Sequence, residues 1–145
     1  MFSSDRDQLR RQYFLAWRKY QQGEALTALE ESIVEVVAEH PEYQPLLASE
    51  DRALGREYLP EQGATNPFLH MGMHLALREQ VATNRPKGIH AVYQALCRAT
   101  RNPLEAEHLM MDCLAESLWQ AQRDGTMPDE RAYLKRLRKL VKRAD

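Results

Sequence analysis

The sequence predicts an all-α protein, a helical bundle of four long helices with one or two shorter ones. Apolar residues recur every three or four positions along most of its 145 residues, as they do in helices that bury one face. Asn-Pro pairs at residues 66–67 and 102–103 have the form of a helix start, a capping side chain followed by proline at the first helical position. No segment alternates apolar and polar residues convincingly enough to predict a strand.

The expected helices are separated by residues that end helices. Gly23, Pro41 and the run from Asn84 to Gly88 are such breaks. Residues 55–65 carry proline and glycine without apolar periodicity and predict the longest irregular connection. The helices are expected at residues 5–22, 25–40, 65–83, 89–100, 102–123 and from about 128 onward, with a short helical turn at Leu46 and Leu47.

Length and composition favour a single cytoplasmic domain over residues 1–145. The 20 Lys and Arg nearly balance the 21 Asp and Glu, so the net charge of -1 gives no overall attraction to nucleic acid or an anionic membrane. Cys97 and Cys113 form no CxxC pair, which favours free thiols in a reducing compartment. We expect neither a signal peptide nor a membrane helix, because no apolar run approaches the roughly 20 residues that a membrane helix needs. The sequence leaves a homo-oligomer open.

Two histidines on one expected helix have the spacing of metal ligands. His70 and His74 are four residues apart, so their imidazoles project from one face of the helix. Metalloproteases use the same spacing in HExxH, but Met71 stands where that motif has its glutamate, and the general base is therefore missing. Gly72 costs the helix about 1 kcal/mol relative to alanine, which predicts a close approach of another helix or room for a ligand.

A third histidine lies between two carboxylates on a later helix. Glu105 is three positions before His108 and Asp112 four positions after it, so all three share a face. Glu-x-x-His is the ligand pair of di-iron bundles, but those bundles use two copies and this chain has one. The sequence therefore predicts a site for one transition-metal ion, held by His70, His74 and His108 with Asp112 or Glu105 as fourth ligand or supporting partner.

Nitrogen and oxygen ligands of this kind suit zinc, iron, manganese or nickel, and no organic cofactor is evident. Three histidines would leave a coordination position open for a water that becomes a nucleophile or for a small ligand such as dioxygen. The residues do not select between these outcomes or decide whether the protein is an enzyme. Packing of the histidines in the core is the alternative interpretation.

Other residues of chemical interest have structural interpretations. His40, at the end of a helix before Pro41, is expected to cap that helix, and His90 is expected at the surface. Trp17 and Trp119 are expected to anchor the core.

The C-terminal helix is basic and amphipathic. No acidic residue interrupts residues 131–143, and apolar residues alternate with the basic ones at helical spacing. The alternative function is therefore a non-enzymatic interaction module that binds RNA, the ribosome or an acidic protein, although one solvated basic face is also ordinary. The residues expected to make these contacts are Arg131, Lys135, Arg136, Arg138 and Lys139.

Several stretches resemble a family of proteobacterial proteins known as domain of unknown function family 1841. They are residues 66–80 (NPFLHMGMHLALREQ), residues 5–13 with Trp17, and residues 105–111 followed by 118–123. The resemblance covers nearly the whole chain and implies a small cytoplasmic bacterial protein, but no established activity or catalytic residue comes with it. A looser similarity to DinB-like and haemerythrin-like bundles is a likeness of fold and does not determine function.

Overall fold

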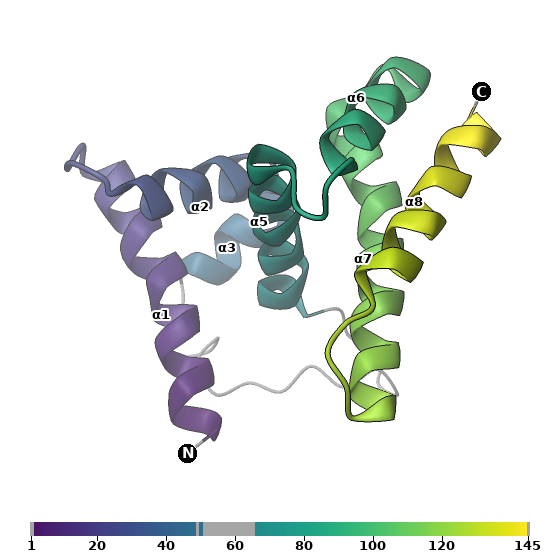
Figure 1. The fold of residues 1–145 in the computed structure, drawn as a ribbon. Coiled ribbons are helices and arrows are strands. Elements are labelled where there is room, and N and C mark those ends of the chain that lie inside the picture. The colour runs from purple at the N-terminus through teal and green to yellow at the C-terminus, as the bar shows by residue number, and fades with distance from the viewer. Residues whose placement is uncertain (1, 49, 51–65, 145) are drawn as a thin grey trace. The chain divides into compact units, whose positions relative to one another are not determined.

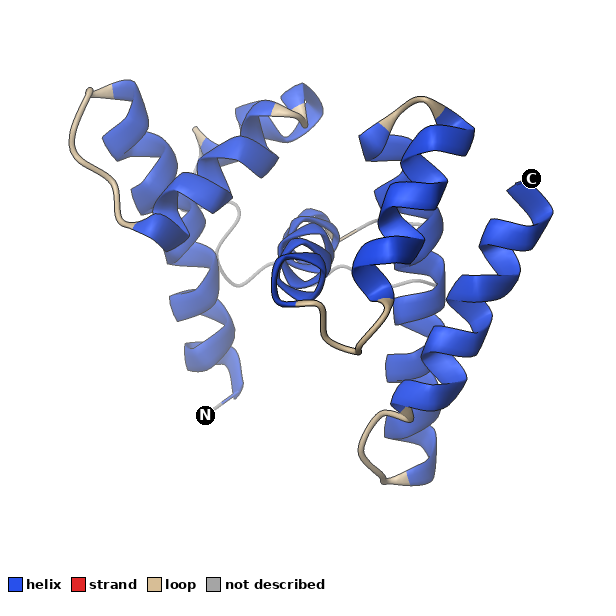
Figure 2. Cartoon of the chain, turned by 45° about the horizontal axis from the view of Figure 1, so that its top comes forward, coloured by secondary structure: helices blue, strands red, loops and turns tan. Residues whose placement is uncertain are grey.

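The computed structural model describes the backbone of residues 2–48, 50 and 66–144, and the side chains of residues 7–48, 50 and 66–144. Within these residues the chain forms helices and loops and no strand (Figure 2), which confirms the predicted all-α class. The chain divides into two compact units, Met1–Leu75 and Ala76–Asp145, and a single bundle of four long helices is not confirmed. The single domain expected over residues 1–145 stays a prediction. The connection expected at residues 55–65 lies outside the described residues.

The first unit is built on a pair of packed helices, α1 and α2 (Figure 1). A short 3-10 helix and α3 follow α2, and the first part of α5 completes the unit. The edge of the Tyr13 ring meets Phe68 with 5.6 Å between ring centroids, which joins α1 to the start of α5. The elements are α1 (Phe2–Gln21), α2 (Ala28–Ala38), η1 (Pro41–Tyr43), α3 (Gln44–Leu47) and α5 (Pro67–Thr83).

The second unit packs α6 (Ile89–Thr100), α7 (Pro103–Asp124) and α8 (Glu130–Ala144) against one another, beside the last part of α5 (Figure 1). Two side-chain contacts connect α5 to these helices. The Arg78 guanidinium donates to both carboxylate oxygens of Glu107 on α7, at 2.9 and 3.1 Å. The Tyr133 hydroxyl on α8 donates to the Gln80 side-chain oxygen at 2.7 Å. Leu96 and Leu137 are fully buried in this unit.

Local capping explains where most helices begin. The side chain of Asn66 accepts hydrogen bonds from the backbone of Phe68 and Leu69 at 3.0 and 3.2 Å, and Asn102 caps α7 in the same way. The two Asn-Pro helix starts predicted from the sequence are thus confirmed. At α2, the Thr27 hydroxyl accepts a hydrogen bond from the backbone N–H of Glu30, and the Glu30 carboxylate accepts one from the backbone N–H of Thr27. This capping box starts the helix at Ala28, later than the expected residue 25.

The prediction for Trp119 is wrong. Its side chain is 55% exposed, and the Arg123 guanidinium covers one face of its ring at 4.8 Å from the centroid. Trp17, by contrast, is half-buried against the core of the first unit and stacks on Tyr20. The apolar stripe of α7 instead buries Met110, Leu114 and neighbouring small residues, because those positions face α6 and α8.

Two smaller predictions can be compared directly with the structure. Cys97 and Cys113 are free thiols, as expected. Among the residues that the structure describes, no helix combines the length and the apolar character required to cross a bilayer.

We expect Thr27→Ala to lower the free energy of unfolding by about 1 kcal/mol, because it removes the hydroxyl that satisfies the Glu30 backbone N–H. Urea unfolding followed by circular dichroism measures this. Ser32→Ala is the matched control within α2, since its hydroxyl only returns to the backbone of Ala28, and it should change stability by less than about 0.5 kcal/mol. Equal stabilities of the two variants would contradict the role given to the capping box.

Candidate metal centre

The imidazoles of His70 and His74 lie against each other on one face of α5. Their Nε2 atoms are 3.2 Å apart and their ring centroids 4.9 Å apart. His74 is fully buried and His70 is half-buried. The predicted arrangement of this pair, one helical turn apart with converging rings, is therefore present in the first unit.

A third imidazole joins the pair from the end of α2. His40 is 3% exposed, and its ring centroid lies 4.8 Å from that of His74 and 5.2 Å from that of His70. Its Nδ1 atom is 2.7 Å from the backbone oxygen of Val36. The expected capping role of His40 is thus confirmed, and the structure adds its position beside the two histidines of α5.

The hydrogen bond to Val36 also determines where the His40 proton lies. A carbonyl oxygen can only accept, so Nδ1 must carry the hydrogen, and in the neutral ring the Nε2 atom then carries the lone pair. Histidines that bind metals commonly have this arrangement, in which one ring nitrogen donates to a backbone carbonyl and the other binds the ion. The bond that caps α2 therefore gives His40 the tautomer in which Nε2 could bind a metal ion.

The spacing of the three rings can be compared with a metal coordination sphere. Each offers a nitrogen atom within 4.8 Å of those of the others. Bonds of about 2.0–2.1 Å to a tetrahedral ion would place ligand nitrogens about 3.3–3.4 Å apart. The His70–His74 pair, at 3.2 Å, already has nearly this separation. The remaining nitrogens, within 4.8 Å of one another, would have to come closer to bind the same ion.

Aromatic and apolar side chains surround the histidines within the first unit. The Tyr43 ring is stacked on His40, with 5.4 Å between centroids, and meets His70 edge-on at 6.0 Å. Burial, and secondarily the negative charge of Glu42, raise the pKa of the Tyr43 phenol, so it contributes a neutral hydroxyl at physiological pH. Met71 is fully buried. The cluster thus has a mainly apolar wall on this side.

Gly72 has a more modest role than the sequence suggested. A Cβ added there would be 3.6 Å from the Tyr13 hydroxyl, which is ordinary van der Waals contact. Helix α1 does approach α5 at this point, as expected, but an alanine would fit. Burial raises the pKa of Tyr13 to about 12, so this neighbour is neutral too.

The other predicted ligands lie on α7, in the second unit. His108 follows the buried Glu107 by one position. Glu105 and Asp112 are exposed, and no carboxylate among the described residues belongs to the converging group. The roles given to His108, Asp112 and Glu105 stay predictions.

Sequence reasoning missed His40 as a member of this cluster. Its position before Pro41 explained it fully as a cap, and nothing local indicated which helix would lie beside it. One signal was available: His40 directly follows a helix whose stripe of Ile33, Val36 and Val37 is strongly apolar, so the end of that helix had to lie close to the core.

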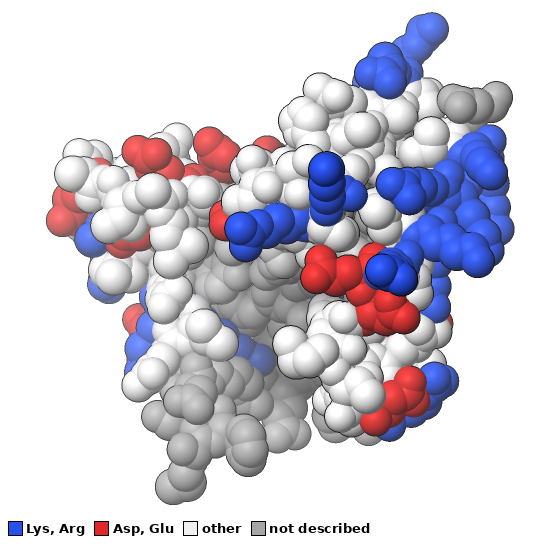
Figure 3. Space-filling view, in the orientation of Figure 1, with Lys and Arg blue, Asp and Glu red and all other residues white. Residues whose placement is uncertain are grey.

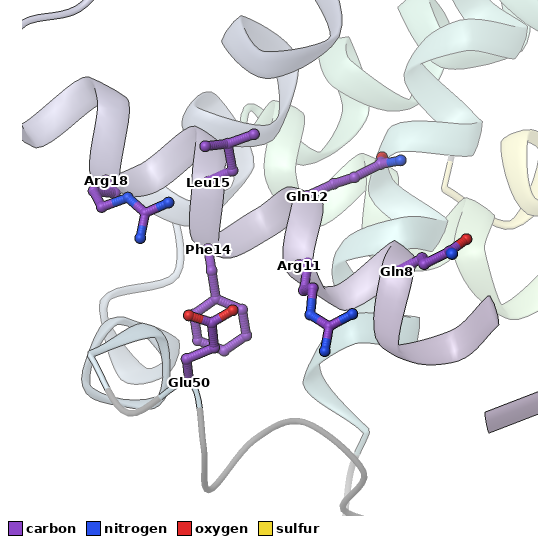
Figure 4. Close-up of a pocket in the computed structure, with 7 residues that line it drawn as sticks. All are labelled: Gln8, Arg11, Gln12, Phe14, Leu15, Arg18 and Glu50. Atoms are coloured by element: carbon purple, nitrogen blue, oxygen red, sulfur yellow. The ribbon is translucent and has the colours of Figure 1, made fainter. Parts of the chain in front are cut away.

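A hollow in the first unit lies along α1, away from the histidines (Figure 4). It has a volume of about 280 Å³. None of the three histidines lines it, and its charged side chains are two arginines and one glutamate. Among the described residues that line it, Glu50 is the single carboxylate, and none is a histidine, cysteine or serine. Its walls are Gln8, Arg11, Gln12, Phe14, Leu15, Arg18 and Glu50.

Comparison with known proteins identifies a family and no activity. The family model described as "Domain of unknown function (DUF1841)" matches residues 5–139. No curated protein and no solved structure matches the chain well enough to count as a relative.

We expect His40→Ala to destabilise the metal-free protein by about 1–3 kcal/mol, because it removes a buried hydrogen bond to Val36 and the ring that packs on Tyr43. Urea unfolding in the presence of a chelator measures this without any contribution from metal. His90→Ala, at an exposed position on α6, is the control and should change stability by less than about 0.5 kcal/mol. A His40→Ala variant as stable as this control would refute the structural role.

Proposed function

The chain belongs to the family DUF1841, a domain of unknown function, and we propose that it binds one divalent transition-metal ion through His40, His70 and His74 of the first unit. We keep His108, which the sequence predicts as a ligand, as the proposed fourth ligand. One observation carries this proposal. Three imidazoles of the first unit converge, and the Nδ1–H of one already donates to a backbone carbonyl, which directs its Nε2 lone pair to the metal.

The donor atoms favour some metals over others. Imidazole nitrogen suits zinc, nickel and iron(II), whereas manganese prefers oxygen ligands. The converging group contains no carboxylate among the described residues. Of the metals compatible with the sequence, we therefore propose zinc, nickel or iron(II) ahead of manganese.

Neutral ligands leave the full charge of the ion in place. A divalent ion held by imidazoles alone keeps its charge of about +2, and this lowers the pKa of a bound water and attracts anions. The number of protein ligands then decides the role of the site. Three histidines leave one position open for water or a small anion, whereas four close a tetrahedral site and make it structural.

The proposal predicts metal in the purified protein. Elemental analysis of protein made without a histidine tag should find about one equivalent of a transition metal in the wild type, and almost none in His70→Ala/His74→Ala, because the proposed ligands that remain, His40 and His108, are too few to hold the ion. His90→Ala is the matched control and should keep the wild-type content. Equal and negligible metal in all three proteins, with no rise in melting temperature on adding zinc, nickel or iron(II), would refute the proposal.

A folding control is needed because His74 is fully buried. Circular dichroism shows whether the double variant is folded. The single variant His70→Gln changes a half-buried side chain and is the milder test, with an expected loss of affinity of about 10-fold or more. Wild-type affinity in a folded His70→Gln would count against the proposed ligand set.

The variant His108→Ala distinguishes a site with four histidine ligands from a site with three histidine ligands and an open position. If His108 is a ligand, its removal should weaken binding and add one water to the cobalt-substituted protein, as seen in the visible absorption spectrum. An unchanged spectrum and affinity would reduce the site to His40, His70 and His74 with an open position. Full metal content in His108→Ala would leave the three-histidine proposal intact.

A further inference from the structure

Helix α8 presents a continuous row of positive charge in the second unit. Its apolar side is used internally, because Tyr133 and Leu137 are 3% and 0% exposed and α8 packs against both α6 and α7. Figure 3 shows Lys and Arg side chains gathered over the part of the molecule where Figure 1 places α8. The exposed cations of the helix are Arg131, Lys135, Arg138, Lys139, Lys142 and Arg143.

Among the residues that the structure describes, no acidic side chain forms an ion pair with these cations. No acidic residue occurs between Arg131 and Arg143. Ion pairs in the described part of the chain include those of Lys19 with Glu30, Arg78 with Glu107 and Arg123 with Asp124, and these pairs leave out the exposed cations of α8. Arg136 differs from them, because it is half-buried and donates to the Gln120 side chain at 2.8 Å. It positions α8 against α7 and is not part of the exposed row.

The spacing of the charges makes them a ridge. Arg131, Lys135, Arg138 and Lys142 follow one another at intervals of four, three and four residues, so they lie along one side of the helix. At 1.5 Å per residue the ridge is about 16 Å long. A rod of evenly spaced cations is complementary to a polymer with evenly spaced anions.

We propose that this ridge binds the phosphate backbone of a nucleic acid duplex, without reading its sequence. A phosphodiester backbone supplies regular negative charge over such a length, and Lys and Arg contacts to it need no apolar anchor. The large exposed apolar residues of the described chain include none on α8, so the ridge also lacks aromatic side chains on which unpaired bases could stack.

Two other partners fit the helix less well. A basic helix that lies on a membrane inserts its apolar face, but the apolar face of α8 is buried in the second unit. A protein interface is usually centred on a buried aromatic or aliphatic anchor, and the ridge offers none. Both partners therefore become outcomes of the test.

The test measures binding of the full chain to a fluorescein-labelled duplex RNA of about 20 base pairs, and to the duplex DNA of the same sequence, by fluorescence anisotropy over a range of salt. The ridge variant is Lys135→Gln/Arg138→Gln/Lys142→Gln. The charge-matched control, Arg11→Gln/Arg18→Gln/Arg98→Gln, removes three exposed arginines outside α8. Both variants change the net charge from -1 to -4, since each loses three positive charges.

We expect the ridge variant to bind about 10-fold or more weakly than the wild type at about 50 mM salt. The slope of log K against log salt concentration should become less steep by about 2–3, since each lost phosphate contact removes about 0.9 from it. The control should stay within about 2-fold of the wild type. Tighter binding of either duplex than of the other identifies the nucleic acid and supports the proposal.

Three results would overturn it. The first is an equal loss of duplex affinity in the ridge variant and in the control. The second is that the wild type binds neither duplex at about 50 mM salt. The third is that it binds poly-glutamate, or vesicles with anionic lipid, as tightly as it binds the duplexes. Circular dichroism of the ridge variant checks that α8 is still folded. An unfolded ridge variant would be replaced by Lys135→Gln/Lys142→Gln, which removes two of the three charges and for which about two thirds of the effect is expected.

Discussion

The burial of imidazole rings is the constraint on which the first unit depends. A polar ring placed in an apolar interior is costly unless its nitrogen atoms find partners. The Nδ1 atom of His40 finds its partner in the Val36 carbonyl, and the Nε2 atoms of His70 and His74 are paired with each other. Helix α2 ends just before His40, which leaves helical angles (φ -126°, ψ 70°) because Pro41 follows it and begins η1. Tyr43, at the end of η1, then stacks on the buried His40 ring.

The close pair on α5 relates the metal-free protein to the proposed metal-bound one. With their Nε2 atoms 3.2 Å apart, one ring donates a proton and the other accepts it. A metal ion would take the place of that hydrogen, and the donating neutral ring would change to its Nδ1–H tautomer. Binding would therefore add a charge of about +2 in mainly apolar surroundings. Those neutral surroundings favour an ion that brings an anion or hydroxide with it.

In the described part of the second unit an ion pair and a hydrogen bond, and not buried imidazoles, connect the helices. Its polar contacts, Arg78 with Glu107 and Tyr133 with Gln80, connect the last part of α5 to α7 and α8. They place α8 so that its apolar residues are buried and its cations are exposed. The family DUF1841 covers both units, and each carries its own candidate chemistry: nitrogen ligands in the first and a cationic ridge in the second.

The sequence by itself determined the all-α class, most helix ends and the His70–His74 pair, because caps, proline and four-residue spacing act within one or two turns. It failed where distant segments must meet. His40 was correctly interpreted as a cap, but its place beside α5 depends on how α2 packs. Trp119 was taken for a core residue, yet the faces of α7 that become buried depend on where α6 and α8 lie. Division into two compact units was not visible either, since periodicity shows that a helix has an apolar face and not which helix covers it. Only the tertiary structure decided which helix faces are buried and which distant segments lie side by side.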